Sequence, residues 1–169
     1  RTSLWVVCTV SSGDPRSGGL RVNTQCVLQF VAMGEDGLPT PVPEFVPADD
    51  WERGEHARAE LLKDVRRAIE AEMAERVYSE HTQACRETLR FLAAPSDVNW
   101  GGKVHGGYVM DWIHQAANLV AERWHGGAAV AVYAGGVRFY HPMFIGDLVE
   151  VEARLIYTGF SSLHVSVHV

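Results

Sequence analysis

Hydrophobic and polar residues follow different periods in different parts of the chain, and these periods predict its secondary structure. Residues 1–10 are mostly β-branched or apolar, and alternate residues along 21–33 would share one face of a strand. That face would carry Val22, Thr24, Cys26, Leu28 and Phe30. The turn signal Gly13-Asp14-Pro15 lies between the two stretches, so they predict a long hairpin. Residues 35–47 hold four of the seven prolines, which predicts an extended segment that leaves the sheet.

A helix is predicted from about residue 51 to about residue 77. Asp49 or Asp50 can cap its start, because an Asp side chain accepts hydrogen bonds from the first free N–H groups of a helix. The apolar stripe of this segment is thin, and charged residues fill the rest. We interpret it as a solvated linker helix, with a partner-binding helix as the alternative.

The second half of the chain reads as one helix among several strands. Apolar residues at helical spacing predict a helix over residues 108–124. Strands are predicted over residues 82–92, 128–140, 147–157 and 161–169, and residues 147–157 alternate most clearly. Short connections between strands that follow one helix favour an antiparallel sheet wrapped around that helix, which is an α+β arrangement.

A glycine-rich stretch, residues 97–107, precedes the central helix and carries the candidate chemistry. Four glycines fall within residues 101–107, where the backbone can approach a ligand closely. The first N–H groups of a helix lack internal partners and attract an anion or a polarised carbonyl oxygen. Asn99 precedes these groups, and His114 follows in the helix. A purely structural turn is the alternative interpretation.

Composition narrows the function classes. The chain has 169 residues, enough for one domain, and a net charge of −6, which gives no electrostatic support for binding nucleic acid. The sequence contains neither a membrane-spanning stretch nor a visible signal peptide. Three cysteines without CxxC spacing fit a reducing compartment, and each is expected to be a small core residue. The histidine spacings predict no metal site.

Several motifs together resemble the hotdog-fold acyl-CoA thioesterases, and most of all the cytosolic acyl-CoA hydrolases with two hotdog units in tandem. The motifs are Asp97-Val98-Asn99, His105-Gly106-Gly107 with Met110, Trp112 and Ile113, Phe139-Tyr-His-Pro142, Gly146-Asp147, and Gly159 with Ser161 and Ser162. The resemblance runs from about residue 85 to residue 169. Residues 3–47 resemble the closing strands and tail of the same unit.

The resemblance implies hydrolysis of a fatty acyl-CoA to the free acid and CoA, at a site shared between two hotdog units. The amides of Gly106 and Gly107 would polarise the thioester carbonyl beside Asn99. A carboxylate on the opposed unit's central helix would act as base or nucleophile. This chain has His114 where many members have that acid, so His114 is a candidate base and Asp111 a second substitute.

The remaining expectations also follow from the resemblance. Candidate substrate-binding residues are His105, Lys103, Arg138, Ser161 and Ser162. No cofactor is expected besides coenzyme A as part of the substrate. The expected partners are acyl-CoA and further copies, as a dimer, a trimer of pairs or a hexamer, with no membrane, in the cytoplasm. A non-catalytic acyl-CoA-binding unit stays open, as does a hydratase that would use the segment from Asp97 to His105.

A repeat links the two ends of the chain. Residues 1–10 align with residues 160–169 at an offset of 159, and four positions are identical: Ser3, Leu4, Val6 and Val10 match Ser162, Leu163, Val165 and Val169. We therefore divide the chain into closing strands and tail of a hotdog unit (1–47), a linker helix (48–79) and the first and central part of a hotdog unit (80–169). A window cut from a tandem protein and a permuted single unit both fit this order.

Overall fold

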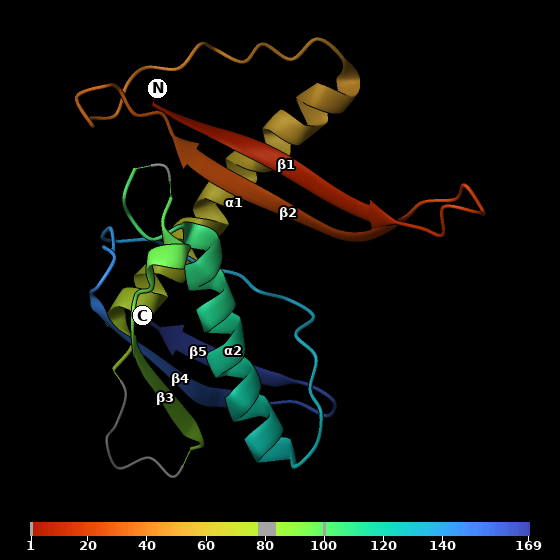
Figure 1. Cartoon of the computed structure of the whole chain (residues 1–169). Helices are drawn as coiled ribbons and strands as arrows, with labels where there is room; N and C mark the ends of the chain where they lie inside the picture. Colours follow the sequence, from red (N-terminus) through yellow and green to blue (C-terminus); the bar gives the residue numbers. More distant parts are fainter. Residues whose placement is uncertain (1, 78–83, 100) are drawn as a thin grey trace. The chain divides into compact units, whose positions relative to one another are not determined.

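The computed structural model describes residues 2–77, 84–99 and 101–169, and it divides the chain into two compact units, residues 1–69 and 70–169. Figure 1 shows the order of the elements along the chain. They are β1 (Ser3–Ser12), β2 (Arg21–Val31), α1 (Asp50–Glu75), β3 (Arg86–Leu92), the 3₁₀ turn η1 (Pro95–Asp97), α2 (Gly106–His125), β4 (Leu148–Thr158) and β5 (Leu163–His168). Thr82, where a strand was expected to begin, and Trp100 lie outside the described residues.

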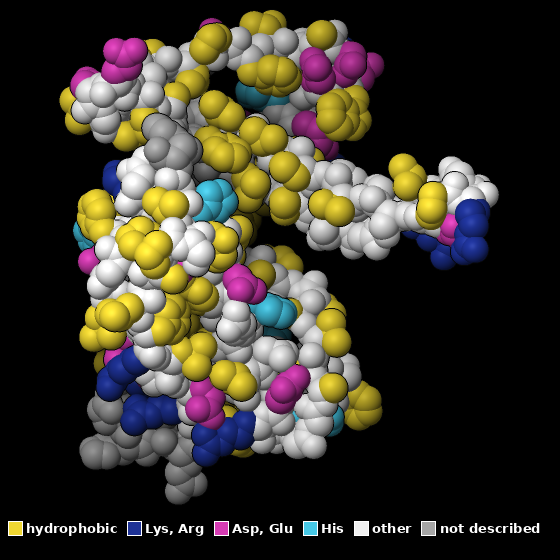
Figure 2. All heavy atoms as spheres, viewed as in Figure 1, with side chains coloured by type: hydrophobic (Ala, Val, Ile, Leu, Met, Phe, Trp, Pro, Cys, Tyr) yellow, Lys and Arg dark blue, Asp and Glu magenta, His cyan; other side chains and the backbone are white. Residues whose placement is uncertain are grey.

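The first unit contains the predicted hairpin. β1 and β2 pair antiparallel, from Ser3 opposite Val31 to Ser12 opposite Arg21, with a bulge where the register shifts between Val10 and Ser11. Figure 2 shows hydrophobic side chains spread along this hairpin, with Lys and Arg side chains gathered at its tip. The hairpin prediction is therefore confirmed, whereas the expectation that its cysteines are core residues is wrong for Cys26, which is exposed.

Helix α1 begins where the sequence predicts. The backbone N–H of Glu52 donates to Oδ1 of Asp49 at 2.8 Å, so Asp49 is the residue that caps the helix. Ion pairs three residues apart follow one another on its surface, such as Arg58 with Glu55 and Lys63 with Glu60. Among its described residues none is buried, as expected for a solvated helix, and its role as a linker stays a prediction.

The second unit is an α+β layer. β3, β4 and β5 form an antiparallel sheet with β4 in the middle, and α2 contacts all three strands (Figure 1). The core consists of alternate residues of β4 and the apolar stripe of α2: Val149, Val151, Ala153 and Leu155 against Val109, Trp112, Ala116 and Val120. Both patterns follow from sequence spacing, because a strand repeats every second residue and a helix every third or fourth. Arg154 differs from expectation: it alternates with the core residues yet is buried, and its Nε donates to Glu152.

The predicted strand over residues 128–140 is absent from this unit, so that prediction is wrong for the chain as described. Residues 128–140 have no strand assignment, and the side chains of Val130 and Val132 are 84% and 92% exposed. A strand requires a neighbouring backbone to exchange hydrogen bonds, and within the described residues β3, β4 and β5 pair only with one another. None of the helices in the described ranges is long and apolar enough to cross a membrane.

Candidate functional site

The glycine-rich stretch is held in place by a buried carboxylate. Asp97 ends η1, and its Oδ2 accepts a hydrogen bond from the Ala94 N–H at 2.9 Å while its Oδ1 accepts one from Ser96 Oγ at 3.1 Å. The carbonyl of Asp97 accepts from the N–H of His105 at 2.8 Å. Asp97 therefore fixes both ends of the loop that leads into α2. With its oxygens engaged in this way, Asp97 does not favour the hydratase alternative.

Asn99 closes the loop with its side-chain oxygen. Oδ1 of Asn99 accepts hydrogen bonds from the N–H groups of Gly101 at 2.7 Å and Lys103 at 3.1 Å. Two N–H donors at one atom identify that atom as the oxygen, so the amide nitrogen Nδ2 is directed away from these donors. Asn99 is half-buried, and no acceptor for its Nδ2 lies among the described residues. Asn99 can therefore donate a hydrogen bond to a bound molecule while its oxygen holds the loop.

The start of α2 has one engaged amide and one open amide. His105 is the N-cap, and its Nδ1 accepts a hydrogen bond from the N–H of Gly107 at 3.0 Å. The N–H of Gly106 has no acceptor within the described ranges. Phe139 covers the Cα of Gly106 so closely that an added Cβ would lie 3.2 Å from the ring atom Cζ. The expectation that both glycine amides are open is thus wrong for Gly107 and holds for Gly106.

This helix start suits a developing negative charge on oxygen. The first turn of α2 contains no acidic residue that would neutralise its partial positive charge, and Arg123 and His125 occupy the last turn. An N–H group at such a position can polarise a carbonyl group and stabilise an oxyanion. An arrangement of this kind can hold an anion or stabilise an oxyanion.

His114 and Asp111 lie on the exposed surface of α2, further along the helix. At about 1.5 Å rise and 100° per residue, both lie close to the side of Gly107, with Asp111 about 6 Å and His114 about 10 Å along the axis. The Asp111 carboxylate accepts a hydrogen bond from Gln115 Nε2 at 2.7 Å. His114 is too far along the helix to act on a carbonyl held at Gly106 of the same unit.

The other predicted substrate-binding residues are spread over the unit. Ser161 and Ser162 are exposed in the turn between β4 and β5. That turn follows Thr158 at one end of β4, whereas Asp147 precedes the other end, and the strand between them is about 33 Å long at roughly 3.3 Å per residue. The glycine loop is tied to the near end, where the N–H of Val104 donates to the carbonyl of Met143 at 2.9 Å. One unit therefore does not bring these serines together with Asn99.

The two predicted basic residues also differ in their positions. Arg138 Nη1 donates to Glu70 at 2.7 Å, and its guanidinium lies over the Tyr140 ring at 5.1 Å from the ring centre, so it is already engaged. Lys103 is exposed in the glycine loop next to Asn99. Arg138 precedes Phe139, which covers Gly106, but its guanidinium is held by Glu70 and Tyr140.

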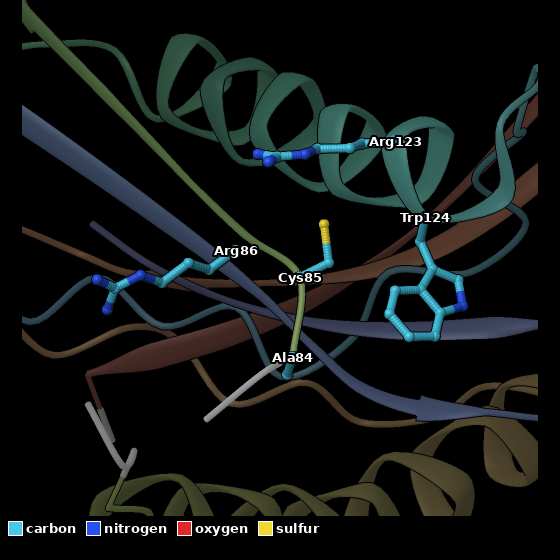
Figure 3. Close-up of a pocket in the computed structure, with 5 residues that line it drawn as sticks. All are labelled: Ala84, Cys85, Arg86, Arg123 and Trp124. Carbon is cyan, nitrogen blue, oxygen red and sulfur yellow. The ribbon is translucent and has the colours of Figure 1, made fainter. Parts of the chain in front are cut away.

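A shallow hollow of about 370 Å³ lies at the opposite end of α2, and Figure 3 shows the residues that line it. Its lining includes Cys85, Arg86, Arg123 and Trp124. Hydrogen bonding and charge attraction from Glu87 raise the pKa of the Arg123 guanidinium above its ordinary value. Because Glu87 already partners Arg123, an anion would have to compete with it. This hollow is a weaker candidate site than the start of α2.

Two residues that shape the site, Asp97 and Phe139, were named in sequence motifs but were not given these roles. The role of Asp97 has a local signal, because an Asp that follows Pro-Ser at the end of a short turn often bonds the preceding backbone. Phe139 lies more than thirty residues from Gly106 in sequence, and no spacing predicts their contact. No group of three His, Cys, Asp or Glu side chains that could hold a metal ion occurs in the part of the chain that the structure describes.

Comparisons with known proteins agree on the class of this unit. Residues 101–169 match the family model of the thioesterase superfamily. The acyl-CoA thioester hydrolase of Escherichia coli (strain K12) is 32% identical over 81 residues, which cover 48% of this chain and 61% of that protein. The cytosolic acyl coenzyme A thioester hydrolase of Mus musculus is 35% identical over 88 residues, which cover 48% of this chain and 23% of that protein.

Among solved structures, the hexameric thioesterase from Yersinia pestis is 31% identical, with a TM-score of 0.47 and coverage of 53% of this chain and 70% of that chain. Residues 101–169 therefore match a thioesterase superfamily domain, and the α+β sheet with its central helix agrees with the hotdog fold of that superfamily. The chain spans about three fifths of the length of its bacterial relative and less than a quarter of the mouse relative.

Proposed function

We propose that the chain is part of an acyl-CoA thioesterase that hydrolyses a fatty acyl-CoA to the free acid and CoA. The observation that carries this proposal is the open N–H of Gly106 at the start of α2, with the amide of Asn99 in the loop that precedes it. The names of the E. coli and mouse relatives, both acyl-CoA thioester hydrolases, support the same reaction. The mouse relative's cytosolic name supports a cytoplasmic location.

In the proposed mechanism the thioester oxygen accepts a hydrogen bond from Gly106. As water adds to the carbonyl carbon, negative charge grows on this oxygen and the hydrogen bond strengthens, which lowers the barrier. Asn99 Nδ2 donates a second hydrogen bond to the substrate. The proton that the base takes from water passes to the sulfur as the C–S bond breaks, so CoA leaves as the thiol and the acid carbonyl re-forms.

The base that activates water comes from a second hotdog unit in this proposal. His114 of the same unit lies about 10 Å along the helix from the glycines, whereas a facing helix can present a side chain directly to the carbonyl. The facing residue is His114 or Asp111 of another copy, or a carboxylate of another unit in a longer protein. A non-catalytic acyl-CoA-binding unit stays a second candidate, because His114 stands where many members have an acid.

Asn99 offers a sharp test of the proposal. We expect Asn99→Asp to lower kcat/KM for acyl-CoA hydrolysis by about 10²-fold or more, because it keeps an oxygen for the Gly101 and Lys103 N–H groups but removes the Nδ2 donor. Asn99→Ala removes both functions and should be at least as slow. The measurement is thiol release from a short, a medium and a long acyl-CoA.

The two variants separate catalysis from loop structure. If Asn99→Asp kept full hydrolytic activity while Asn99→Ala lost it, Asn99 would serve only to hold the loop and would not donate to the substrate. If the wild-type protein bound acyl-CoA but did not hydrolyse it, the chain would be a non-catalytic acyl-CoA-binding unit. Absence of both binding and turnover would contradict the proposed function.

We further propose that residues 128–140 pair with the same segment of a second hotdog unit. This segment is apolar, exposed and without strand partners in its own unit, and β-branched residues such as Val130 and Val132 favour a strand. Such pairing gives an oligomer of paired units, which the hexameric name of the Yersinia pestis structure supports. We also propose that β1 and β2 are the closing strands of a hotdog unit, because β1 repeats the sequence of β5.

We expect Val132→Pro to halve the oligomer or dissociate it to single copies, as measured by light scattering after gel filtration. Proline removes the backbone donor that pairing requires, and residue 132 makes no strand bond within its own described unit, so the unit itself stays folded. Val130→Thr keeps the strand preference and serves as the control. An unchanged mass for Val132→Pro would contradict this pairing.

A further inference from the structure

Two cysteines lie directly opposite each other in the hairpin. In the register of β1 and β2, Cys8 is the partner of Cys26. Directly opposed residues of an antiparallel pair project from the same face, so the two thiols are neighbours. Cys26 is exposed and Cys8 is half-buried, and both thiols are free. Nothing in the proposed hydrolysis uses either of them.

The backbone spacing at this pair suits a disulfide. The N–H of Ala32 donates to the carbonyl of Thr2 at 2.8 Å, which makes these two opposed residues a hydrogen-bonded pair. Pair types alternate along the ladder, and the only register shift comes later, at Val10. Cys8 and Cys26 are therefore also a hydrogen-bonded pair, with Cα atoms about 5.5 Å apart. Disulfides span Cα separations of roughly 4.4–6.8 Å.

We infer that Cys8 and Cys26 form a reversible cross-strand disulfide when a small disulfide such as oxidised glutathione is present. The thiolate of the exposed Cys26 attacks the small disulfide and releases one small thiol. The thiolate of Cys8 then attacks the mixed disulfide, which forms the Cys8–Cys26 bond and releases the second small thiol. The protein loses two protons and two electrons, and the small disulfide gains them as two thiols.

The geometry also predicts that the bond is easily reduced. Opposed Cβ atoms in a hydrogen-bonded pair lie toward the upper end of about 4.5–5.5 Å, whereas a relaxed disulfide needs roughly 3.5–4.5 Å, so the two side chains must approach by about 1 Å. An exposed and slightly strained disulfide belongs to the labile class that thiols reduce readily. Oxidation thus fastens the two strands reversibly.

The repeat supplies a matched control. Val167 of β5 stands at the position equivalent to Cys8, at the same offset of 159 residues, so valine fits this place in a related strand. Cys8→Val should therefore preserve the hairpin while it removes one thiol. Cys85, in the other unit, serves as an internal control, because Cys8 and Cys26 are the only opposed cysteines in the described strand registers.

The test is treatment of the whole folded protein with oxidised glutathione, followed by thiol counting and peptide mapping by mass spectrometry. We expect two of the three thiols to disappear, with a cross-linked peptide that joins Cys8 to Cys26 and a free Cys85. Excess reduced glutathione should restore all three free thiols. The Cys8→Val variant should form no disulfide within the chain.

Dynamics provide a second readout that does not depend on the variant. Hydrogen exchange of the β1 and β2 amides should slow by about tenfold or more on oxidation, because the bond closes a loop in the opened hairpin. Unchanged thiols, or glutathione attached to Cys26 without an internal bond, would overturn the inference. Equal exchange in the oxidised and reduced protein would also overturn it.

Discussion

Gly106→Ala should lower kcat/KM for acyl-CoA hydrolysis by about 10²–10³-fold, the range typical of losing one oxyanion donor. The added Cβ would lie 3.2 Å from Phe139 Cζ, which is tighter than ordinary packing, so either the ring or the helix start must shift. The N–H that the substrate needs would shift with it. Thiol release from acyl-CoA measures the effect.

The same substitution should change the free energy of unfolding by no more than about 1 kcal/mol, because the helix preference of alanine offsets the tight contact with the Phe139 ring. Gly106 does not have a positive φ, and alanine favours a helix over glycine by about 1 kcal/mol. Removal of the ring in Gly106→Ala/Phe139→Ala should restore room and recover part of the activity. Wild-type activity in Gly106→Ala would show that the thioester binds elsewhere.

Trp112→Ala should lower the free energy of unfolding of the second unit by about 3–5 kcal/mol, as is typical when a large core side chain is removed. Trp112 is only 8% exposed, and its ring meets the edge of Phe91 at 4.8 Å between centres. Because small domains are stable by about 5–15 kcal/mol, this loss brings the unit close to unfolding. Urea denaturation followed by circular dichroism measures the change.

Leu119→Ala provides the control for Trp112. Leu119 lies on the same helix but is 45% exposed, so its removal should cost under about 1 kcal/mol. Similar losses for the two variants would mean that α2 does not pack through the face described above.

The sequence pattern correctly predicted those helices and strands that bury one face in a core formed by the chain itself. The stripe of α2 from Val109 to Val120 and the alternation of β4 from Val149 to Leu155 are the clearest cases, because burial of one face imposes a period on the sequence. The strand expected over residues 128–140 rests on an apolar, β-branched run without such alternation, and a strand also needs a neighbouring backbone, which side-chain pattern does not supply.

The candidate site was predictable only at the level of the segment. Glycine content and the start of a helix indicate backbone N–H groups without partners. In the structure the Gly107 N–H donates to the His105 side chain, and of the two only the Gly106 N–H stays open within the described residues. That choice depends on the rotamer of one side chain, which spacing does not determine. The pairing of Cys8 with Cys26 depends on the length of the turn and on the bulge after Val10, and neither is encoded in a simple alternation.

The central claim is that an acyl thioester is bound and polarised at the start of α2. The most direct measurement is the amide spectrum of the ¹⁵N-labelled protein during titration with an acyl-CoA analogue in which CH₂ replaces the sulfur, so that the carbonyl remains and cannot be hydrolysed. We expect the Gly106 amide proton to move downfield, together with the side-chain amide of Asn99. Unchanged Gly106 and Asn99 signals, with shifts confined to residues around Cys85 and Trp124, would contradict the account.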